Sequence, residues 1–377
     1  MGLLTSDLPD FPWDTLTPFA ERARAYPGGI VDLSVGTPVD PTPDVVREAL
    51  AAAADSPGYP TTHGTPELRQ AVVDWFARRR GVRGLDRAGV LPTVGSKELV
   101  AFLPSLLGLG RGDVVLHPGA AYPTYDVGAR LAGATPEPSD DPAARLADGR
   151  GDVRLVWLNS PGNPTGAVLG VDQLRAVVDA ARSSAQPVVV ASDECYAELA
   201  WDEPWASSGV PSILDPRVTG GDLTGLLAVY SLSKQSNLAG YRAAFVAGDP
   251  ALVARLLEIR KHAGMIVPGP VQAATAAALA DDEHVAAQRA VYGRRRRVLR
   301  AAFESAGYAV DRSHAGLYLW VRPESGGQDS WATVADLAGL GILVAPGAFY
   351  GDAEHVRVAV TASDERIAEA AARLSGA

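Results

Sequence analysis

The sequence contains very little cysteine and very little lysine. Cys195 is the single cysteine among 377 residues, so no intramolecular disulfide can form, and a reducing compartment, the cytoplasm, is expected. Of the 34 basic residues only three are lysine (Lys97, Lys234 and Lys261), which leaves 34 − 3 = 31 arginines. A chain that uses arginine almost everywhere retains a lysine where arginine cannot act. Schiff-base formation, which needs an amine that can lose its proton, is one such task.

The chain also lacks an excess of positive charge and a long apolar run. Its net charge is −10 and its pI is about 5.1, which argues against a general affinity for nucleic acid or for anionic membranes. The basic run at 294–297 precedes V-L-R-A-A-F and is expected on the solvated face of a helix. The N-terminus carries acids and prolines where a signal peptide has a basic start, and the apolar stretch 99–109 is too short to cross a bilayer. Neither a membrane nor a nucleic acid is therefore an expected partner.

Several sequence motifs of catalysis are missing or incomplete. There is no G-x-x-x-x-G-K-[ST], and the six histidines are scattered without an H-E-x-x-H pair, so no catalytic metal is expected. Ser231 to Lys234 does match S-x-x-K, the nucleophile motif of penicillin-binding proteins and β-lactamases. Those enzymes also need K-T-G, but Lys97 is followed by Glu98 and Lys261 by His262. The missing partner motif disfavours a serine nucleophile.

From about residue 90 the chain alternates short apolar runs with helical patterns, which predicts βαβ units and a mainly parallel sheet. In such α/β sheets ligands bind outside the carboxyl ends of the strands. The predicted strands are Val90–Val94, Asp113–His117, Val153–Asn159, Pro187–Ser192, Leu226–Ser231 and Ala243–Ala247.

After about residue 285 the pattern becomes α+β, which predicts a second, smaller domain. The Pro/Gly-rich N-terminal segment is expected to pack with this domain, and the stretch 135–151 is expected to be a surface connection. The predicted division is an N-terminal arm with part of the small domain (1–45), a large domain (46–284) and a small C-terminal domain (285–377). The predicted elements of the last part are helices 286–306 and 331–340, strands 316–321, 342–345 and 355–360, and a helix from Asp364.

Polar residues with chemical potential follow several predicted strands. Gly95 and Ser96 open a helix after the first strand and can form a phosphate cradle, although a plain helix cap has the same pattern. The turn N-S-P-G-N-P-T-G can hold Asn163 at the ligand edge, although bare turns of this composition are common. Asp193 ends a buried strand, where it is either a strand-end cap or the partner of a positively charged ring nitrogen. The adjacent Cys195 is expected to be a small core residue.

The stretch Y-S-L-S-K-Q-S-N-L-A-G-Y-R, from Tyr230 to Arg242, follows another strand. It brings Lys234, serine hydroxyls and Arg242 to the same edge as the phosphate cradle. This combination indicates a phosphorylated aldehyde cofactor that is held at both ends.

Taken together and in this order, G-S-K-E, Y-P-T-Y, N-P-T-G, D-E-C-Y, S-L-S-K and G-Y-R resemble the fold-type I pyridoxal-phosphate enzymes, specifically the class I aminotransferases. The resemblance covers almost the whole chain. It implies an α/β fold whose large domain has a mainly parallel seven-stranded sheet between helices, a smaller α+β domain, and pyridoxal 5′-phosphate (PLP) as the cofactor.

The resemblance also implies residue roles. Lys234 would bind the cofactor covalently and then move a proton between the substrate and the cofactor, while Asp193 would pair with the ring nitrogen. Tyr196 and Asn163 would hydrogen-bond the phenolic oxygen, and Tyr122 would stack on the ring. The phosphate would be held by Gly95, Ser96, Lys97, Ser231, Ser233 and Arg242.

Three further residues concern the substrate and a partner subunit. Tyr59 matches a tyrosine that reaches the phosphate in the neighbouring subunit, which implies a homodimer with shared active sites. Arg357 in H-V-R-V-A-V matches the arginine that binds the substrate α-carboxylate, assisted by Gly36. On spacing alone Arg357 is also compatible with a surface strand.

A finer resemblance concerns the substrate. Five segments look like the actinobacterial type of succinyldiaminopimelate transaminase, which takes its amino group from glutamate. They are F-P-W-D-T-L, D-L-S-V-G-T-P-V-D-P-T-P, Y-P-T-Y-D-V-G-A-R-L-A-G-A, R-K-H-A-G-M-I-V-P and A-G-L-Y-L-W-V. Arg260, Lys261 and His262, with the following G-M-I-V-P segment, are a hypothetical anchor for the distal end of that substrate near the subunit boundary, with an ordinary helix end as the equal alternative. An aminotransferase of aspartate or of broad specificity is the next alternative, followed by a PLP-dependent C–S lyase.

Overall fold

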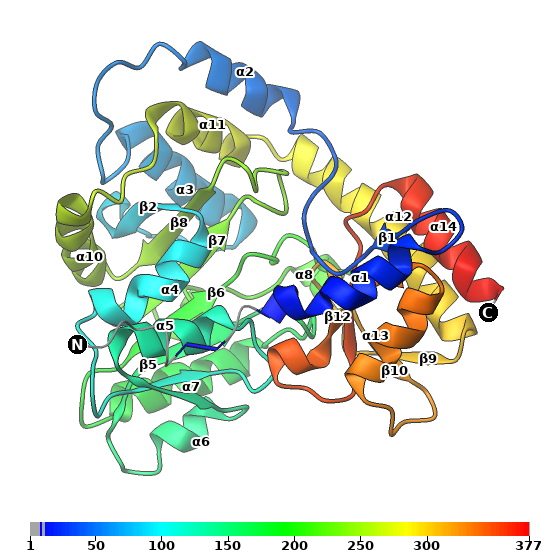
Figure 1. The fold of residues 1–377 in the computed structure, drawn as a ribbon. Helices are drawn as coiled ribbons and strands as arrows, with labels where there is room; N and C mark the ends of the chain where they lie inside the picture. Colours follow the sequence, from blue (N-terminus) through cyan, green and yellow to red (C-terminus); the bar gives the residue numbers. More distant parts are fainter. Residues whose placement is uncertain (1–7, 10–11, 377) are drawn as a thin grey trace, which may run out of the picture.

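A seven-stranded sheet forms the centre of the computed structural model, which describes residues 8–9 and 12–376 (Figure 1). The strand order is β2-β8-β7-β6-β5-β3-β4, and β8 alone runs antiparallel to its neighbours. This confirms the predicted α/β fold with a mainly parallel seven-stranded sheet. The strands are β2 (Val90–Val94), β3 (Val114–His117), β4 (Thr135–Pro138), β5 (Val153–Asn159), β6 (Val189–Asp193), β7 (Leu226–Ser231) and β8 (Ala243–Gly248).

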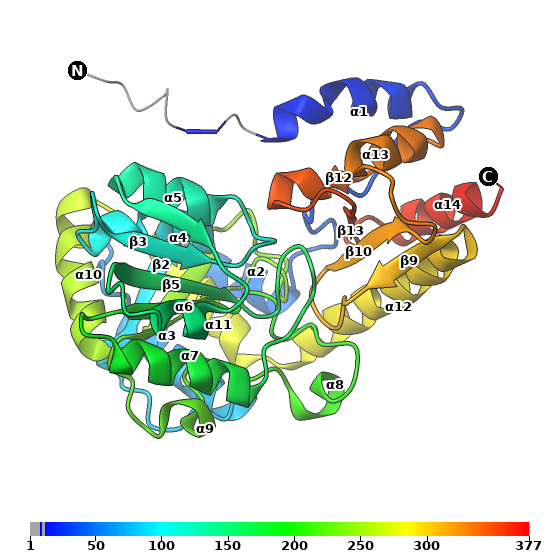
Figure 2. The same ribbon diagram turned by 90° about the horizontal axis from the view of Figure 1, so that it is seen from below.

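Helices cover both faces of this sheet (Figure 2). One face packs on α4 (Ser96–Leu106), α5 (Thr124–Ala132) and α10 (Pro250–Ala263). The other packs on α3 (Pro66–Arg79), α7 (Val171–Ser183) and α11 (Gly269–Ala280). Because both faces are covered, the central strands are apolar along their whole length, as in L-L-A-V-Y-S of β7, where every residue is buried.

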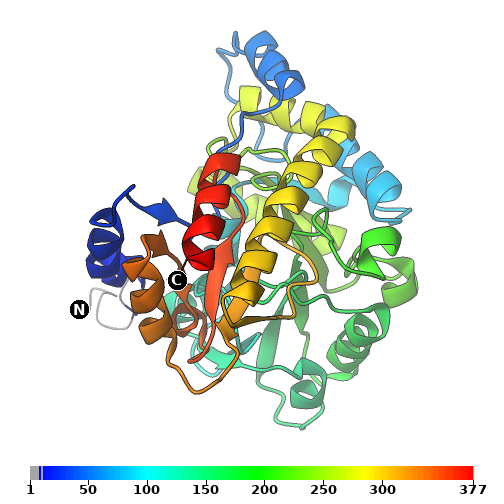
Figure 3. The same ribbon diagram turned by 90° about the vertical axis from the view of Figure 1, so that its right-hand side faces the viewer.

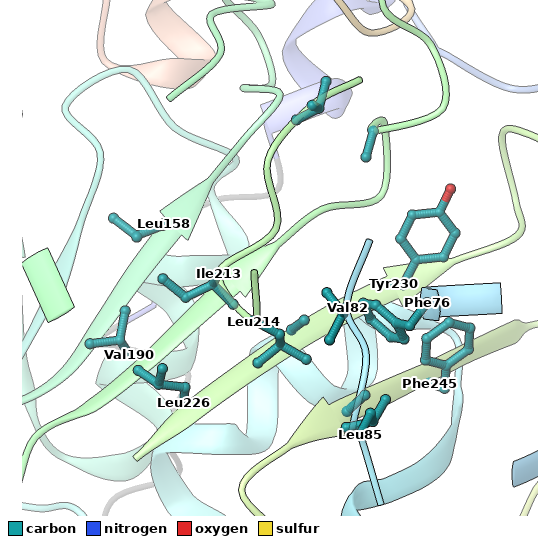
Figure 4. Close-up of a cluster of buried hydrophobic side chains, with 14 of the residues drawn as sticks. Phe76, Val82, Leu85, Leu158, Val190, Ile213, Leu214, Leu226, Tyr230 and Phe245 are labelled. Carbon is teal, nitrogen blue, oxygen red and sulfur yellow. The ribbon is translucent and has the colours of Figure 1, made fainter. Parts of the chain in front are cut away.

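The larger apolar cluster lies on the α3, α7 and α11 face, and Figure 4 shows part of it. Phe76 from α3 packs edge to face against Phe245 from β8, with ring centroids 6.1 Å apart. Tyr230 of β7 stacks on the same Phe245. This packing fixes the end of β7, from which the chain continues into the stretch that contains Lys234.

A second group of elements lies beside the sheet (Figure 3). Its own sheet has the order β12-β13-β10-β9, and its long helix α12 packs on α14. The elements are α12 (Glu283–Ser305), β9 (Tyr308–Asp311), β10 (Tyr318–Pro323), α13 (Ser330–Gly339), β11 (Ile342–Leu343), β12 (Ala345–Pro346), η4 (Gly347–Tyr350), β13 (Val356–Ala359) and α14 (Asp364–Ser375).

The N-terminal segment packs with these C-terminal elements, as expected from the sequence. Strand β1 (Val31–Asp32) pairs in parallel with β11, and α1 (Thr17–Arg24) contacts α13. Residues 1–7 of the predicted arm, and Phe11 of the F-P-W-D-T-L segment, lie outside the described residues. The division at residues 45 and 284 stays a prediction.

The stretch 135–151 differs from the predicted surface connection. It contains β4, which pairs with β3 alone at the edge of the sheet, and the short helix α6 (Pro142–Leu146). The sequence T-P-E-P has two prolines and no apolar run, so its pattern does not predict a strand. An edge strand nevertheless tolerates proline, because one of its sides makes no ladder hydrogen bonds. The remaining short elements are η2 (Pro12–Leu16), α2 (Asp44–Ala52), η3 (Arg87–Gly89), α8 (Trp205–Ser208) and α9 (Pro216–Thr219).

None of the helices among the described residues combines the length and the apolar character that a membrane crossing requires.

Candidate active site

A cavity of about 530 Å³ opens where the carboxyl ends of the central strands meet β10, β13 and the segment after β1. Its volume is within the range of small-molecule sites, about 300–1,000 Å³. Of the 14 residues predicted for the site, 12 line this cavity: Gly36, Ser96, Lys97, Tyr122, Asn163, Asp193, Tyr196, Ser231, Ser233, Lys234, Arg242 and Arg357. Gly95 directly precedes the lining residue Ser96 but does not itself line the cavity, and Tyr59 lies on the surface outside the cavity.

Asp193 is a buried carboxylate at the end of β6. Its Oδ2 accepts a hydrogen bond from the Tyr125 hydroxyl at 3.0 Å, and its Oδ1 accepts one from the Cys195 backbone N–H at 3.2 Å. Burial raises the pKa of Asp193, although both hydrogen bonds oppose the shift. No cation forms an ion pair with it among the described residues, so the carboxylate is prepared for a positively charged partner in the cavity.

Lys234 lies in the connection between β7 and β8 and is partly buried. Its Nζ donates a hydrogen bond to the Gly36 carbonyl oxygen, which belongs to the segment after β1. Burial lowers the pKa of Lys234, and the charges of Arg357 and Arg242 act in the same direction. A lysine amine with a lowered pKa loses its proton more readily and can attack an aldehyde carbon.

Gly95 and Arg242 form the end of the cavity that suits an anion. Gly95 has φ +76°, directly before α4, and a Cβ at this position would lie 2.1 Å from Nη2 of Arg242. Glycine is therefore required for the guanidinium to reach the start of the helix, where backbone N–H groups point outward. Ser231 Oγ and Ser233 Oγ, 2.8 Å apart, line the same cavity.

Arg357 on β13 is a buried cation, 3% exposed, and no carboxylate pairs with it among the described residues. Its Nη1 donates to Asn163 Oδ1 at 3.0 Å and its Nη2 to the Ser34 carbonyl oxygen at 2.6 Å, while Nε finds no hydrogen-bond partner in the part of the chain that the structure describes. Tyr318 lies against the guanidinium, with Cζ 4.1 Å from the ring centroid. An unneutralised cation that lines a cavity is a binding site for an anionic group. This burial excludes the surface-strand alternative.

Tyrosines form the remaining walls. Lys97 Nζ lies 5.9 Å from the ring centroid of Tyr122, and Tyr122 packs edge to face on Tyr125. The hydroxyls of Tyr196 and Tyr318 are 3.3 Å apart. Asn163 is fixed by its turn, because its backbone N–H donates to Asn159 Oδ1 at 2.7 Å.

The sequence predictions missed several lining residues, among them Trp13, Tyr125, Asn159 and Tyr318. Tyr125 at the start of α5 is the second tyrosine of the motif Y-P-T-Y that also contains Tyr122, so the motif itself was a signal for it. Trp13 and Tyr318 come from distant parts of the chain; they lie in the segments F-P-W-D-T-L and A-G-L-Y-L-W-V, whose resemblance assigned them no role in the site. Cys195 is buried as predicted, but it also lines the cavity.

Two other predicted features lie outside the cavity. The Tyr59 side chain is completely exposed. Arg260 is buried in an ion pair with Glu98, at 2.6 Å, and Lys261 pairs with Glu258 on the surface of α10. Within one chain the hypothetical anchor at 260–262 therefore does not contact the cavity, and a contribution across a subunit boundary stays a prediction.

This fold and site place the chain in a known class of enzyme. The chain belongs to the family described as aminotransferase class I and II, whose profile matches residues 29–374, and this family depends on PLP. The chain is 56% identical to the 4-dedimethylamino-4-oxo-anhydrotetracycline transaminase OxyQ of Streptomyces rimosus, over 98% of this chain and 99% of that protein. It is 57% identical to a probable aminotransferase of Mycobacterium tuberculosis, over 99% of this chain and 87% of that protein.

More distant proteins share the same architecture. An LL-diaminopimelate aminotransferase of Gloeobacter violaceus is 34% identical over 95% of this chain and 93% of its own length. The crystal structure of an aminotransferase from Neisseria meningitidis superposes with a TM-score of 0.87, covers 100% of this chain and 98% of its own, and is 30% identical. The predicted family, fold and enzyme class are thus confirmed.

The cavity fits PLP, which carries an aldehyde, a phosphate and a ring nitrogen. The buried amine of Lys234 suits the aldehyde, and the carboxylate of Asp193 suits a protonated ring nitrogen. The Gly95 cradle, which any larger side chain would fill, suits the phosphate together with Arg242.

Proposed function

We propose that this aminotransferase acts as a succinyldiaminopimelate transaminase, which moves an amino group from glutamate to N-succinyl-2-amino-6-oxopimelate in lysine and diaminopimelate biosynthesis. The site-based support is the unneutralised Arg357 in the same cavity as Lys234, which suits an amino acid held by its α-carboxylate next to a reactive amine. For the acceptor, the support is the resemblance of the segments given above and the 34% identity to an LL-diaminopimelate aminotransferase, whose named substrate is a diaminopimelate.

In this proposal Lys234 would hold the cofactor covalently and would then move a proton at the substrate Cα. Its lowered pKa suits both tasks, because the amine has to accept and release a proton near neutral pH. When bound, PLP supplies an electron sink for the charge that develops at Cα. Asp193 keeps the ring nitrogen protonated, and the Tyr125 hydroxyl orients that carboxylate.

In the proposal the other residues hold and orient the cofactor and the substrate. Asn163 and Tyr196 donate hydrogen bonds to the phenolic oxygen, and Tyr122 stacks on the ring. Arg357 binds the substrate carboxylate as a fork, with Gly36 beside it. The phosphate is held by Gly95, Ser96, Lys97, Ser231, Ser233 and Arg242.

The proposal includes a homodimer with shared active sites in the cytoplasm. Tyr59 is the residue that we assign to the neighbouring subunit's phosphate, and its complete exposure in one chain agrees with such a contact. A tyrosine this exposed in the monomer has apolar surface available for an interface.

A second acceptor class is favoured by one specific observation. The Streptomyces rimosus relative, at 56% identity, is named for an amino transfer to a ketone of an anhydrotetracycline, which is a polycyclic substrate. The same chemistry at Lys234 would serve such a ketone, and only the acceptor part of the cavity would differ. Aspartate or broad-specificity transamination and C–S lysis are the further alternatives on this scaffold.

An acceptor panel with glutamate as donor tests the proposal. The panel contains N-succinyl-2-amino-6-oxopimelate, oxaloacetate, an aromatic keto acid and a polycyclic ketone, each measured as kcat/KM. We expect the succinylated oxopimelate to exceed every other acceptor at least tenfold. A preference for oxaloacetate or for the polycyclic ketone overturns the acceptor assignment and leaves amino transfer intact. Pyruvate and ammonia released from cysteine derivatives would indicate the lyase.

A further inference from the structure

One tyrosine connects the two functional ends of the cavity. Tyr318 opens β10, is 5% exposed, and pairs in register with Ala359 on β13, two residues beyond Arg357. Residues two apart on a strand point to the same face, so the strand pairing brings the Tyr318 and Arg357 side chains to the same side of the small sheet. We propose that Tyr318 is a positioning residue of the transamination site, which orients the Tyr196 hydroxyl and supports the Arg357 guanidinium at the same time.

The first contact is with Tyr196. The two hydroxyl oxygens are 3.3 Å apart, and the rings cross at 70° with centroids 5.7 Å apart. A tyrosine hydroxyl has one proton to donate and can also accept. If Tyr196 donates to the phenolic oxygen of the cofactor, as proposed above, it has to accept from Tyr318. The hydrogen-bond order is then Tyr318 to Tyr196 to the cofactor.

The charges around the pair favour the same order. Burial raises the pKa of Tyr318, but the charges of Arg357 and Lys234 act against it, and the pKa of Tyr318 lies below its usual value. Burial raises the pKa of Tyr196, and Tyr318 adds to that shift. Cys195 raises the pKa of both phenols, Arg357 also lowers that of Tyr196, and burial raises the pKa of the Cys195 thiol itself. The more acidic phenol is the better donor, which supports the order in which Tyr318 donates and Tyr196 accepts.

The second contact is with Arg357. Its Cζ lies 4.1 Å from the Tyr318 ring centroid, closer than to Tyr350 at 4.9 Å or Trp13 at 6.0 Å. Aromatic faces partly compensate a buried cation that has no carboxylate. The ring of Tyr318 therefore fixes the fork that would hold the substrate carboxylate, and this task does not need its hydroxyl.

The Tyr318 hydroxyl leaves no room for a side chain at position 36. A Cβ at Gly36 would lie 2.3 Å from the Tyr318 hydroxyl oxygen, and the Gly36 carbonyl accepts from Lys234. The hydroxyl is thus packed between the lysine segment and the segment after β1. This placement explains why glycine is needed at position 36.

The two tasks can be separated by two variants, and this test rests on the proposed amino donor. Tyr318→Phe keeps the ring and removes the hydroxyl. We expect an unchanged KM for glutamate, a fall of about tenfold in kcat, and an upward shift in the pH midpoint of the bound cofactor's absorbance without substrate. The shift has the same sign as, and is smaller than, that of Tyr196→Phe. Tyr318→Leu also removes the ring, and we expect the KM for glutamate to rise about tenfold in addition.

Tyr308→Phe is the matched control, because Tyr308 lies on β9 outside the cavity, and we expect no change in either quantity. Thermal unfolding of the cofactor-free proteins checks that the variants fold. An unshifted absorbance midpoint together with an unchanged kcat in Tyr318→Phe overturns the proposal. Wild-type protein that does not react with glutamate but reacts with aspartate overturns the donor assignment instead, and the variants are then compared with that donor.

Discussion

Replacing Arg357 with glutamine removes the cation that we assign to the substrate α-carboxylate. Because Arg357 is 3% exposed, solvent screens its charge little. Removal of one member of a buried, hydrogen-bonded charge pair costs about 2–5 kcal/mol. At about 1.4 kcal/mol per factor of ten, kcat/KM for glutamate should fall by about 30-fold to about 4,000-fold. The glutamine amide can still donate toward Asn163 or Ser34, so the wall of the cavity is kept.

The assay compares two amines that differ only in the α-carboxylate. The first half-reaction is followed by cofactor absorbance with glutamate and with 4-aminobutyrate, which lacks that group. The wild-type protein should strongly prefer glutamate, whereas Arg357→Gln should show little preference. Arg322→Gln, on the neighbouring strand β10 and paired with Asp311, is the control and should behave like the wild type. A loss of less than threefold, or an equal loss with both amines, would refute the assignment.

Three further predictions concern the surroundings of the cofactor. Gly95→Ala places a Cβ against Arg242 at φ +76°, and a PLP titration of the cofactor-free protein should show a Kd at least about tenfold higher. Tyr125→Phe removes a donor from Asp193 and raises its pKa further, so the acid limb of PLP affinity against pH should move to higher pH; an unmoved limb contradicts this. Arg80→Met leaves Glu194 buried without its cation, which should lower the free energy of unfolding by about 3–5 kcal/mol in urea. Burial raises the pKa of Glu194 and Arg80 opposes this shift, so the folded variant without Arg80 binds a proton at Glu194 more readily. A protonated Glu194 carries no buried charge, and the loss of unfolding free energy should therefore be larger at pH 8 than at pH 5. An equal loss at both pH values contradicts the account.

The central strands were predictable because their hydrophobic runs are continuous. The predicted β2 and β5 have the observed bounds, and the start of β6 differs by two residues. The edge strand β4 was missed because T-P-E-P has no apolar run, and the half-buried β9 was missed because its apolar run Y-A-V is only three residues long. The reversed direction of β8 was predictable in principle. Only residues 232–242 connect β7 to β8, which is short for the crossover that a parallel neighbour needs.

The site residues likewise divide into those that the sequence indicated and those that it did not. Asp193 and Lys234 were identified because they follow strand ends, which a parallel sheet brings to one edge. Tyr318 was missed because its place in the cavity depends on how β10 packs against the large sheet, and no local pattern reports that packing. The hypothetical anchor at 260–262 is the opposite case, in which a local pattern indicated a site that lies outside the cavity of one chain. Basic residues at the end of α10 have the composition of an anion site, but Arg260 is already neutralised by Glu98 from a helix 162 residues earlier.

The most direct test of the account is the position of the covalent bond to the cofactor. Protein loaded with PLP is reduced with sodium borohydride, digested, and mapped by mass spectrometry. The chain contains only three lysines, so the outcome is unambiguous. The account predicts one modified peptide, which contains Lys234, and no modification in the otherwise identical experiment on Lys234→Ala. Modification of Lys97 or Lys261 in place of Lys234, or no covalent adduct in the wild-type protein, would contradict it.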